Sequence, residues 1–416
     1  MTDVLIIGAG PAGSTAAAFL VRKGFKVLVL EKQRFPRFSV GESMLPASME
    51  FIEKAGMMEA VMAASFQYKD GAVFHLDDQR HEFKFPLKFT PGYGFTFEVP
   101  RDEFDKILID EAERQGAEVR YEVEITAVDF TGGQPTVTAR TKDGAIETHK
   151  PRFVLDASGF GRTLPRLLDL EVPSSFPTRA ALFTQVYDHI PSGAFDRQKI
   201  LVTIHPKHRD VWYWLIPFSN GRVSMGVVAR DEFLQQYKGT PEERLWAIHN
   251  EVPTLRELLK NAKPANPVGE LRGYSANVKS LWGPGWALLG NAAEFLDPVF
   301  SSGVCIAMKS ADLAAEVLGR QLKGETVDWE AEFAAPLKIG VDTFRGFVEC
   351  WYDGSLADIF FHPNKREKIQ RMICSVLAGY GWDLSNPYVG VGKRRLVALA
   401  EACRGGAAAS EQSLLA

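Results

Sequence analysis

The stretch Val4-Leu5-Ile6-Ile7-Gly8-Ala9-Gly10-Pro11-Ala12-Gly13 decides the fold of this chain. Its first four residues form a continuous apolar run, which predicts a strand covered on both faces in a parallel sheet. The residues from Ser14 to Lys23 predict a helix that stops at Gly24, and Lys26 to Leu30 predict a second strand that leads into Glu31. Strand, glycine turn, helix, strand and acid in this order predict a dinucleotide-binding unit.

The three glycines each have a physical role in such a unit. Gly8 makes the tight turn, Gly10 lets the backbone approach a pyrophosphate, and Gly13 lets the helix pack closely on the strand. Free N–H groups at the start of the helix favour phosphate, and Glu31 is placed to accept hydrogen bonds from a ribose. The alternative is a glycine turn that joins strand and helix without binding any ligand.

Length and charge exclude several classes of protein. The chain has 416 residues, with 48 Lys and Arg, 52 Asp and Glu and a formal net charge of -4. This length predicts one large interleaved domain or two domains, and without a basic excess we expect no nucleic acid partner. No apolar run approaches the length of a membrane span, and Asp3 interrupts the pattern of a signal peptide. We therefore expect a cytoplasmic protein.

The sequence offers no pattern for metal or hydrolase chemistry. Cys305, Cys350, Cys374 and Cys403 are widely spaced and form no C-x-x-C pair. We therefore expect inert thiols and no metal site. No serine lies in a G-x-S-x-G turn, so hydrolase chemistry has no support.

Four later segments complete the pattern. Residues 35–46 place a basic residue, a glycine and a carboxylate in a loop, and Arg101 lies at the start of a predicted helix that runs to Gln115. Residues 153–159 predict a third strand that ends in an acid and small residues, and residues 288–298 predict a fourth. A helix is expected from about Val304 to Leu322.

Together these residues resemble the FAD-dependent monooxygenase superfamily with the p-hydroxybenzoate hydroxylase fold, in the branch of the flavin-dependent halogenases and geranylgeranyl reductases. The resemblance implies that Asp297-Pro298 lies against the isoalloxazine and that the helix near Gly303 directs its N-terminus at the flavin. Gly290-Asn291 stands where many relatives have Gly-Asp. The residues that the resemblance and the glycine motif assign to FAD are Gly8, Gly10, Pro11, Ala12, Gly13, Glu31, Lys32, Arg37, Gly41, Glu42, Ser43, Arg101, Ile125, Asp156, Ala157, Ser158, Gly159, Arg162, Gly290, Asn291, Asp297, Pro298, Gly303 and Val304.

A second motif narrows the chemistry. Residues 211–228 predict a β-hairpin with an Asn-Gly turn at Asn220-Gly221. Within it, Trp212-x-Trp214-x-Ile216-Pro217 resembles the W-x-W-x-I-P signature of flavin-dependent halogenases. The alternative is an aromatic wall of a substrate sheet. Phe83 to Phe97 carry further alternating aromatic residues, which predict strands beside an apolar pocket.

Lys69 lies where halogenases of the phenolic and carrier-bound type place a lysine. It is the only Lys or Arg between Lys54 and Arg80. In that family the lysine binds the oxidised halogen and directs it at an electron-rich ring. The alternative is a solvated surface lysine, which is the common state of lysine.

The resemblance implies a two-component halogenase that activates O2 on reduced FAD and acts on a phenol, pyrrole or polyketide-type ring. Backbone N–H groups around Ser302 and Gly303 would hold a halide ion, while Trp212 and Trp214 would keep the substrate away from the flavin. The alternatives are an aromatic or polyketide monooxygenase, a reductase of C=C bonds similar to geranylgeranyl reductases, and a flavin-binding protein without catalysis.

No second G-x-G-x-x-G occurs, so a flavin reductase or transient NAD(P)H docking must supply the reduced flavin. The aromatic substrate can be free or bound to a carrier protein. We expect an α/β fold: a Rossmann-like FAD-binding domain from residues 1–75, 101–175 and 270–330, and an inserted, mostly antiparallel substrate sheet from 76–100 and 176–269. C-terminal helices occupy 331–403, and 404–416 form a disordered tail.

Overall fold

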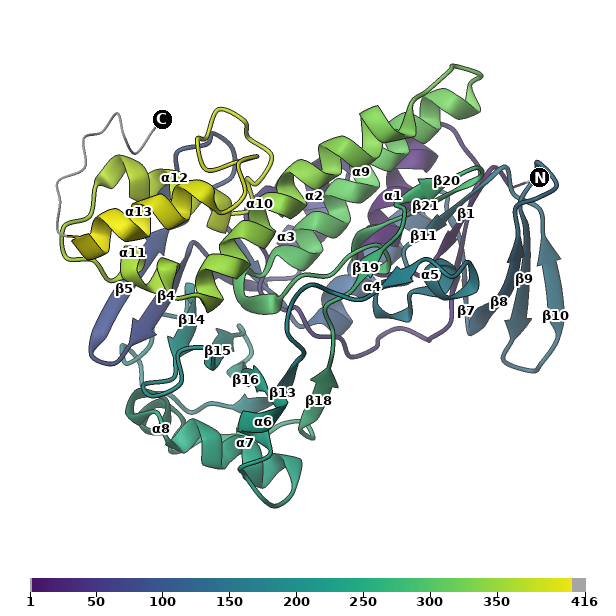
Figure 1. Cartoon of the computed structure of the whole chain (residues 1–416). Helices are drawn as coiled ribbons and strands as arrows, with labels where there is room; N and C mark the ends of the chain where they lie inside the picture. The colour runs from purple at the N-terminus through teal and green to yellow at the C-terminus, as the bar shows by residue number, and fades with distance from the viewer. Residues whose placement is uncertain (1, 406–416) are drawn as a thin grey trace.

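Two large sheets organise the chain in the computed structural model, which describes residues 2–405 (Figure 1). The first is six-stranded, in the order β20-β21-β11-β1-β2-β7. Its neighbours run parallel except for β20 and β21. The strands are β1 Val4–Ile7, β2 Val27–Glu31, β7 Glu118–Tyr121, β11 Phe153–Asp156, β20 Trp282–Gly283 and β21 Trp286–Leu288.

Both faces of this sheet are covered, which explains the continuous apolar run of β1. Val4 and Ile6 pack with helices α1 (Pro11–Arg22), α4 (Arg101–Arg114) and α9 (Ser302–Leu322) on one face. Leu5 and Ile7 pack on the other face against α5 and a three-stranded sheet. These covering elements are α5 Thr163–Leu167, β8 Val123–Asp129, β9 Thr136–Thr141 and β10 Ile146–His149.

The second sheet has eight strands, in the order β17-β13-β16-β15-β14-β4-β5, with β18 also paired to β13. Only β4 and β14 run parallel, so the predicted α/β fold with a mostly antiparallel second sheet is confirmed. The expected hairpin is β15 and β16. The strands are β4 Gly71–Leu76, β5 Gln79–Lys84, β13 Arg179–Tyr187, β14 Lys199–Ile204, β15 Trp212–Pro217, β16 Arg222–Arg230, β17 Lys263–Pro264 and β18 Gly269–Arg272.

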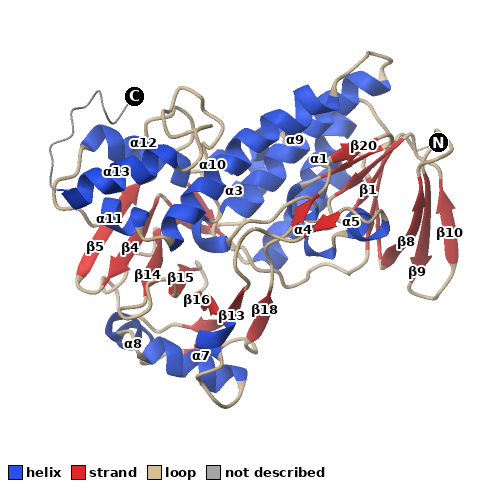
Figure 2. Cartoon of the chain, in the orientation of Figure 1, coloured by secondary structure: helices blue, strands red, loops and turns tan. Residues whose placement is uncertain are grey.

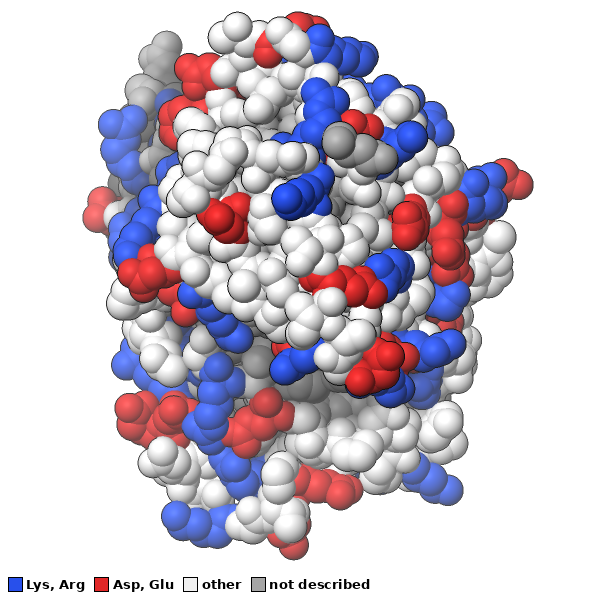
Figure 3. All heavy atoms as spheres, turned by 90° about the vertical axis from the view of Figure 1, so that its right-hand side faces the viewer, with Lys and Arg blue, Asp and Glu red and all other residues white. Residues whose placement is uncertain are grey.

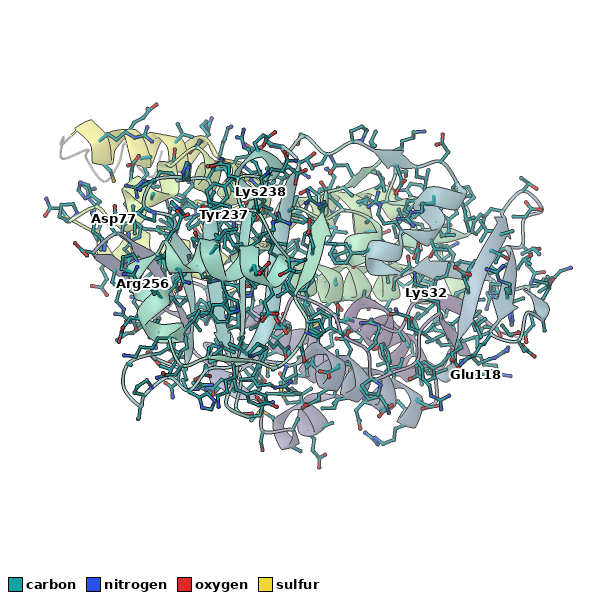
Figure 4. The ribbon with its side chains drawn as sticks, turned by 90° about the horizontal axis from the view of Figure 1, so that it is seen from below. Lys32, Asp77, Glu118, Tyr237, Lys238 and Arg256 are labelled. Carbon is teal, nitrogen blue, oxygen red and sulfur yellow. The ribbon has the colours of Figure 1, made fainter. Side chains whose placement is uncertain are left out.

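Helices cover the two faces of the eight-stranded sheet differently. Short helices α6 (Asp231–Leu234), α7 (Pro241–Asn250) and α8 (Pro253–Leu259) pack on its outer face. Figure 4 shows Tyr237 and Arg256 on that side, far from Lys32 and Glu118, which belong to the region of the six-stranded sheet. The C-terminal helices lie beside β4 and β5 (Figure 2) and share the main core with α1 and α9. They are α10 Ala335–Tyr352, α11 Ser355–Phe360, α12 Glu367–Leu377 and α13 Arg394–Gly405.

Several boundaries differ from the sequence expectation. Gly71–Leu76 pairs with β14 in the eight-stranded sheet, although we assigned residues up to 75 to the FAD-binding domain. The aromatic run of residues 83–97 is strand only at its ends, because Pro86, Pro91 and two glycines interrupt the backbone ladder. Short elements outside the two large sheets are α2 Ala47–Lys54, α3 Met58–Ala63, β3 Gln67–Lys69, β6 Thr96–Glu98, β12 Glu171–Val172 and β19 Asn277–Val278.

The C-terminal end also differs. Arg404 and Gly405 are the last residues of α13 and not part of a tail. The rest of the expected tail, residues 406–416, lies outside the described residues.

Within residues 2–405, none of the helices combines the length and the apolar character that crossing a membrane requires. On the face shown in Figure 3, acidic and basic side chains are interspersed, and neither sign forms a continuous surface. The described part of the chain also contains no group of three or more His, Cys, Asp or Glu side chains placed to share a metal ion.

Candidate functional site

The glycine turn has the geometry that its sequence predicts. Gly8 has φ +95°, and a Cβ added there would lie 2.6 Å from the Ala157 carbonyl oxygen. A Cβ at Gly13 would overlap the Gly8 carbonyl, so helix α1 packs directly on the turn. Both positions therefore require glycine, one for its backbone conformation and the other for the close approach.

The start of α1 is open to an anionic ligand. Its N-cap, Gly10, has no side chain to accept the free N–H groups, and the first turn contains no acid. Glu31 is held beside this turn because its Oε2 accepts the Ala9 N–H at 2.9 Å and its Oε1 accepts the Gln33 N–H at 2.9 Å. Free N–H groups for phosphates and a fixed carboxylate for a ribose are the features that FAD needs here.

A cavity of about 450 Å³ begins at this turn and extends to the eight-stranded sheet. This volume falls in the usual range for cofactor and substrate pockets. The start of α9 reaches the same cavity, and no side chain caps that helix. The predicted site residues that line the cavity are Gly8, Gly10, Pro11, Ala12, Glu31, Lys32, Arg37, Gly41, Glu42, Ser43, Arg101, Ala157, Ser158, Gly159, Trp212, Trp214, Asn291, Pro298, Gly303 and Val304.

Other predicted cofactor residues do not line the cavity but hold the lining residues in place. Asp156 accepts the backbone N–H groups of Ser158 (2.9 Å) and Leu164 (2.6 Å), which fixes the turn after β11. Arg162 is buried and ion-paired with Glu171 at 2.8 Å. Gly290 allows close contact with Ala307 of α9, because a Cβ there would lie 2.8 Å from the Ala307 Cβ.

Ile125 does not lie at the cavity. It is a buried residue of β8 and packs in the core between the three-stranded sheet and the six-stranded sheet. The structure therefore gives it a packing position and no place among the cavity-lining residues. Ser302 is the first residue of α9 and is buried directly beside the lining residue Gly303.

The two tryptophans of the W-x-W-x-I-P motif form part of the cavity wall. Both side chains are buried, and their ring centroids are 5.8 Å apart. Trp214 donates its indole N–H to Ser224 Oγ at 3.1 Å. Trp212 donates to the hydroxyl of Tyr352 at 3.0 Å, and Tyr352 in turn donates to Asp297 Oδ2 at 2.8 Å.

This Trp212-Tyr352-Asp297 network joins the eight-stranded sheet, helix α10 and the turn before α9. Burial raises the pKa of Asp297 to about 6, although hydrogen bonds from Tyr352 and the Val299 N–H oppose that shift. Tyr352 was not predicted, because 140 positions separate it from Trp212 and nothing in its local sequence marks it.

Lys69 is buried, which excludes the alternative of a solvated surface lysine. Its Nζ donates to Ser43 Oγ at 2.6 Å and to the Met44 carbonyl at 2.8 Å. Burial lowers the pKa of the Lys69 amine to about 8. The amine does not line the cavity itself, but its partner Ser43 does.

Two carboxyls near Lys69 carry raised pKa values. Burial raises the pKa of Glu42 to about 7, against a hydrogen bond from the Gln185 amide at 2.6 Å. Glu98 on β6 is fully buried, and burial raises its pKa well above the ordinary value. Neither Glu98 oxygen has a hydrogen-bond partner among residues 2–405. No motif in the sequence marks Glu98, whereas Glu42 belongs to the predicted cofactor loop.

Known proteins share this architecture. The FAD binding domain family matches residues 1–332. The 1H-pyrrole-2-carbonyl-(peptidyl-carrier protein) chlorinase of Pseudomonas fluorescens is 31% identical over 381 residues, which cover 84% of this chain and 83% of that protein.

Solved structures agree with the sequence relatives. A flavoprotein/dehydrogenase from Cytophaga hutchinsonii has a TM-score of 0.94 and 43% identity, with 97% of this chain and 99% of that chain covered. The myxobacterial chondrochloren halogenase has a TM-score of 0.77 and 28% identity, with 99% of both chains covered. The chain therefore belongs to the FAD-dependent monooxygenase superfamily, in the branch of the flavin-dependent halogenases.

Proposed function

We propose that this FAD-dependent oxidoreductase is a two-component halogenase that acts on an electron-rich aromatic ring, free or bound to a carrier protein. One observation carries the proposal: Lys69 is buried next to the cavity that Trp212 and Trp214 line, and Ser43 connects the two. FAD, when reduced by a separate flavin reductase, supplies the electrons for the reaction of O2 with halide.

The overall reaction balances as aromatic C–H, halide, O2, reduced FAD and one proton going to aromatic C–halogen, oxidised FAD and two waters. Different residues of the chain would carry out different parts of this reaction. The uncapped N-terminus of α9 at Ser302 and Gly303 favours an anion such as halide. Trp212 and Trp214 exclude the aromatic substrate and water from the flavin part of the cavity.

Lys69 would direct the oxidised halogen. Its amine uses two N–H donors for Ser43 and Met44, and its position is fixed by burial. A fixed donor can bind hypohalous acid, polarise it and present it to a ring carbon, where the C–halogen bond forms as water leaves. Lys69 would supply the proton that converts the leaving hydroxide to water, and the proton lost from the ring carbon would restore it. The name of the Pseudomonas fluorescens relative, a chlorinase of a carrier-bound pyrrole, supports an electron-rich aromatic ring as the substrate class.

Replacement of Lys69 by methionine tests the proposal, because methionine keeps the bulk and removes the amine. We expect Lys69→Met to lower halogenated product by at least about 100-fold, the effect of losing one positioned proton donor, while FAD affinity is retained. The assay contains NADH, a flavin reductase, O2, bromide and a panel of phenols and pyrroles, with products measured by mass spectrometry.

The matched control is Lys84→Met, since Lys84 is exposed at the end of β5. It should halogenate as the unmodified protein does. Equal turnover in Lys69→Met would remove Lys69 from the mechanism. A product that carries ¹⁸O from ¹⁸O2 and forms without halide would show a hydroxylase instead.

A further inference from the structure

Arg179 is a buried cation that forms no ion pair with any carboxylate of residues 2–405. It is the first residue of β13, with 3% of its surface exposed. Ala181 and Phe183, two and four positions further along the strand, line the cavity. Because alternate residues of a strand point to the same face, Arg179 lies on the face that the two tryptophans share.

The contacts of Arg179 include no direct ion pair within residues 2–405. Its guanidinium carbon lies 3.4 Å from the centre of the Tyr352 ring, and its best hydrogen bond is a 3.5 Å contact from Nη1 to the Pro177 carbonyl. Its Nε has no hydrogen-bond partner, and its guanidinium forms no ion pair with an Asp or Glu of residues 2–405. Buried guanidinium groups in proteins are normally paired with carboxylate or phosphate.

Asp297 is close enough for its charge to attract that of Arg179, but the two side chains form no ion pair. Its Oδ2 accepts Tyr352 and Tyr274 hydroxyls, and its Oδ1 accepts the Val299 N–H. Arginine keeps its charge in proteins, so an anion in direct contact would stabilise this buried guanidinium further. Arg179 is not among the residues that line the large cavity, so an aromatic substrate held in that cavity would not contact its guanidinium.

We propose that Arg179, stacked on Tyr352, forms a halide-binding site beside Trp212 and Trp214, separate from the backbone N–H groups at the start of α9. A guanidinium is weakly hydrated, which suits bromide and chloride, since these ions also lose hydration easily. The Tyr352 hydroxyl links this position to Asp297 and so to the turn that precedes α9. The site would hold halide close to where it is consumed. This inference rests on the proposed halogenase function.

Bromide binding to the protein with oxidised FAD bound tests the site without turnover. The probe is sodium bromide at constant ionic strength, followed by the ⁸¹Br NMR line width. We expect Arg179→Gln to weaken bromide binding at least about tenfold and Arg179→Lys to weaken it less, because lysine keeps the charge. The control is Arg256→Gln, on the exposed surface of α8 (Figure 4).

Bromide binding within twofold of the unmodified protein in Arg179→Gln would overturn the site. Benzoate binding that depends on Arg179 while bromide binding does not would also overturn it, in favour of an anionic group of the substrate. If Arg179→Gln does not fold, anomalous diffraction from bromide in crystals of the unmodified protein shows whether bromide binds at Arg179. A bromide peak at the guanidinium supports the site, and peaks only elsewhere contradict it.

The two proposals fail separately. Arg179-dependent bromide binding without any halogenated product would leave the site standing and contradict the halogenase function. Normal halogenation together with unchanged bromide binding in Arg179→Gln would support the halogenase function and contradict the halide site at Arg179.

Discussion

Glu42 shows how burial gives a single carboxyl an unusual effect on stability. The folded protein keeps the Glu42 proton up to its pKa of about 7, whereas the ordinary value is 4.5. Between these values the folded state binds more protons than the unfolded state, so stability falls as the pH rises. The Glu42 carboxyl thus stabilises the fold at low pH, and that contribution is lost as the pH rises through about 7.

Glu42→Gln removes this titration and keeps an acceptor for the Gln185 amide. Between pH 5 and pH 8 we expect the unmodified protein to lose about 2 kcal/mol more stability than Glu42→Gln does. Urea unfolding of the FAD-free proteins at pH 5 and pH 8 measures this change in the free energy of unfolding. Glu124→Gln, at an exposed position of β8, serves as the control. Parallel pH dependence in Glu42→Gln and the unmodified protein would contradict the burial argument.

At the scale of elements, the β15–β16 hairpin depends on a glycine opposite a tryptophan. Gly226 is paired with Trp214 in the register. A Cβ at Gly226 would overlap the Trp214 ring and lie 2.8 Å from the Leu182 carbonyl oxygen. The ring therefore lies flat over the neighbouring strand only because that strand carries no side chain there.

Gly226→Ala should displace the Trp214 ring and destabilise the protein by about 1–3 kcal/mol, the usual effect of overpacking. Guanidinium unfolding and tryptophan emission measure the two effects. Gly132→Ala is the matched control, because nothing lies within 4 Å of a Cβ at Gly132. If Gly226→Ala and Gly132→Ala behave alike, the hairpin tolerates a shifted ring and the explanation fails.

On the scale of the whole molecule, Tyr352 connects parts that are far apart in the sequence. It bonds Trp212 of the eight-stranded sheet and Asp297 of the nucleotide-binding half from its own place at the end of α10. Removing its hydroxyl leaves a buried indole N–H without this acceptor and a buried carboxyl without this donor.

Tyr352→Phe should therefore lower the free energy of unfolding by about 1–3 kcal/mol. Tyr187→Phe, at the exposed end of β13, should change it by less than about 0.5 kcal/mol. Chemical denaturation at pH 7 compares them. Equal stability of the two variants would mean that the network contributes little to holding the three parts together.

The sequence predicts best where a function is local. The glycine turn, Glu31 and the start of α9 were placed correctly in the fold because short-range geometry fixes strand, turn and helix together. Prediction failed where neighbours come from distant segments. Tyr352 meets Trp212, and Gln185 meets Glu42, only through tertiary packing. Residues 83–97 alternate in the sequence, yet proline and glycine override that alternation.

The cavity wall has a consequence for how the protein is made. Its residues run from Gly8 to Ala307, so a ribosome must add more than 300 residues before the flavin cradle is complete. The Ala47 N–H then bonds the Ala378 carbonyl at 3.0 Å, which ties the segment after the Ser43 loop to the end of α12. We therefore expect the cofactor to bind only after most of the chain has been synthesised. The glycine turn at Gly8 is synthesised early, but the other residues that line the cavity with it are added only later in translation.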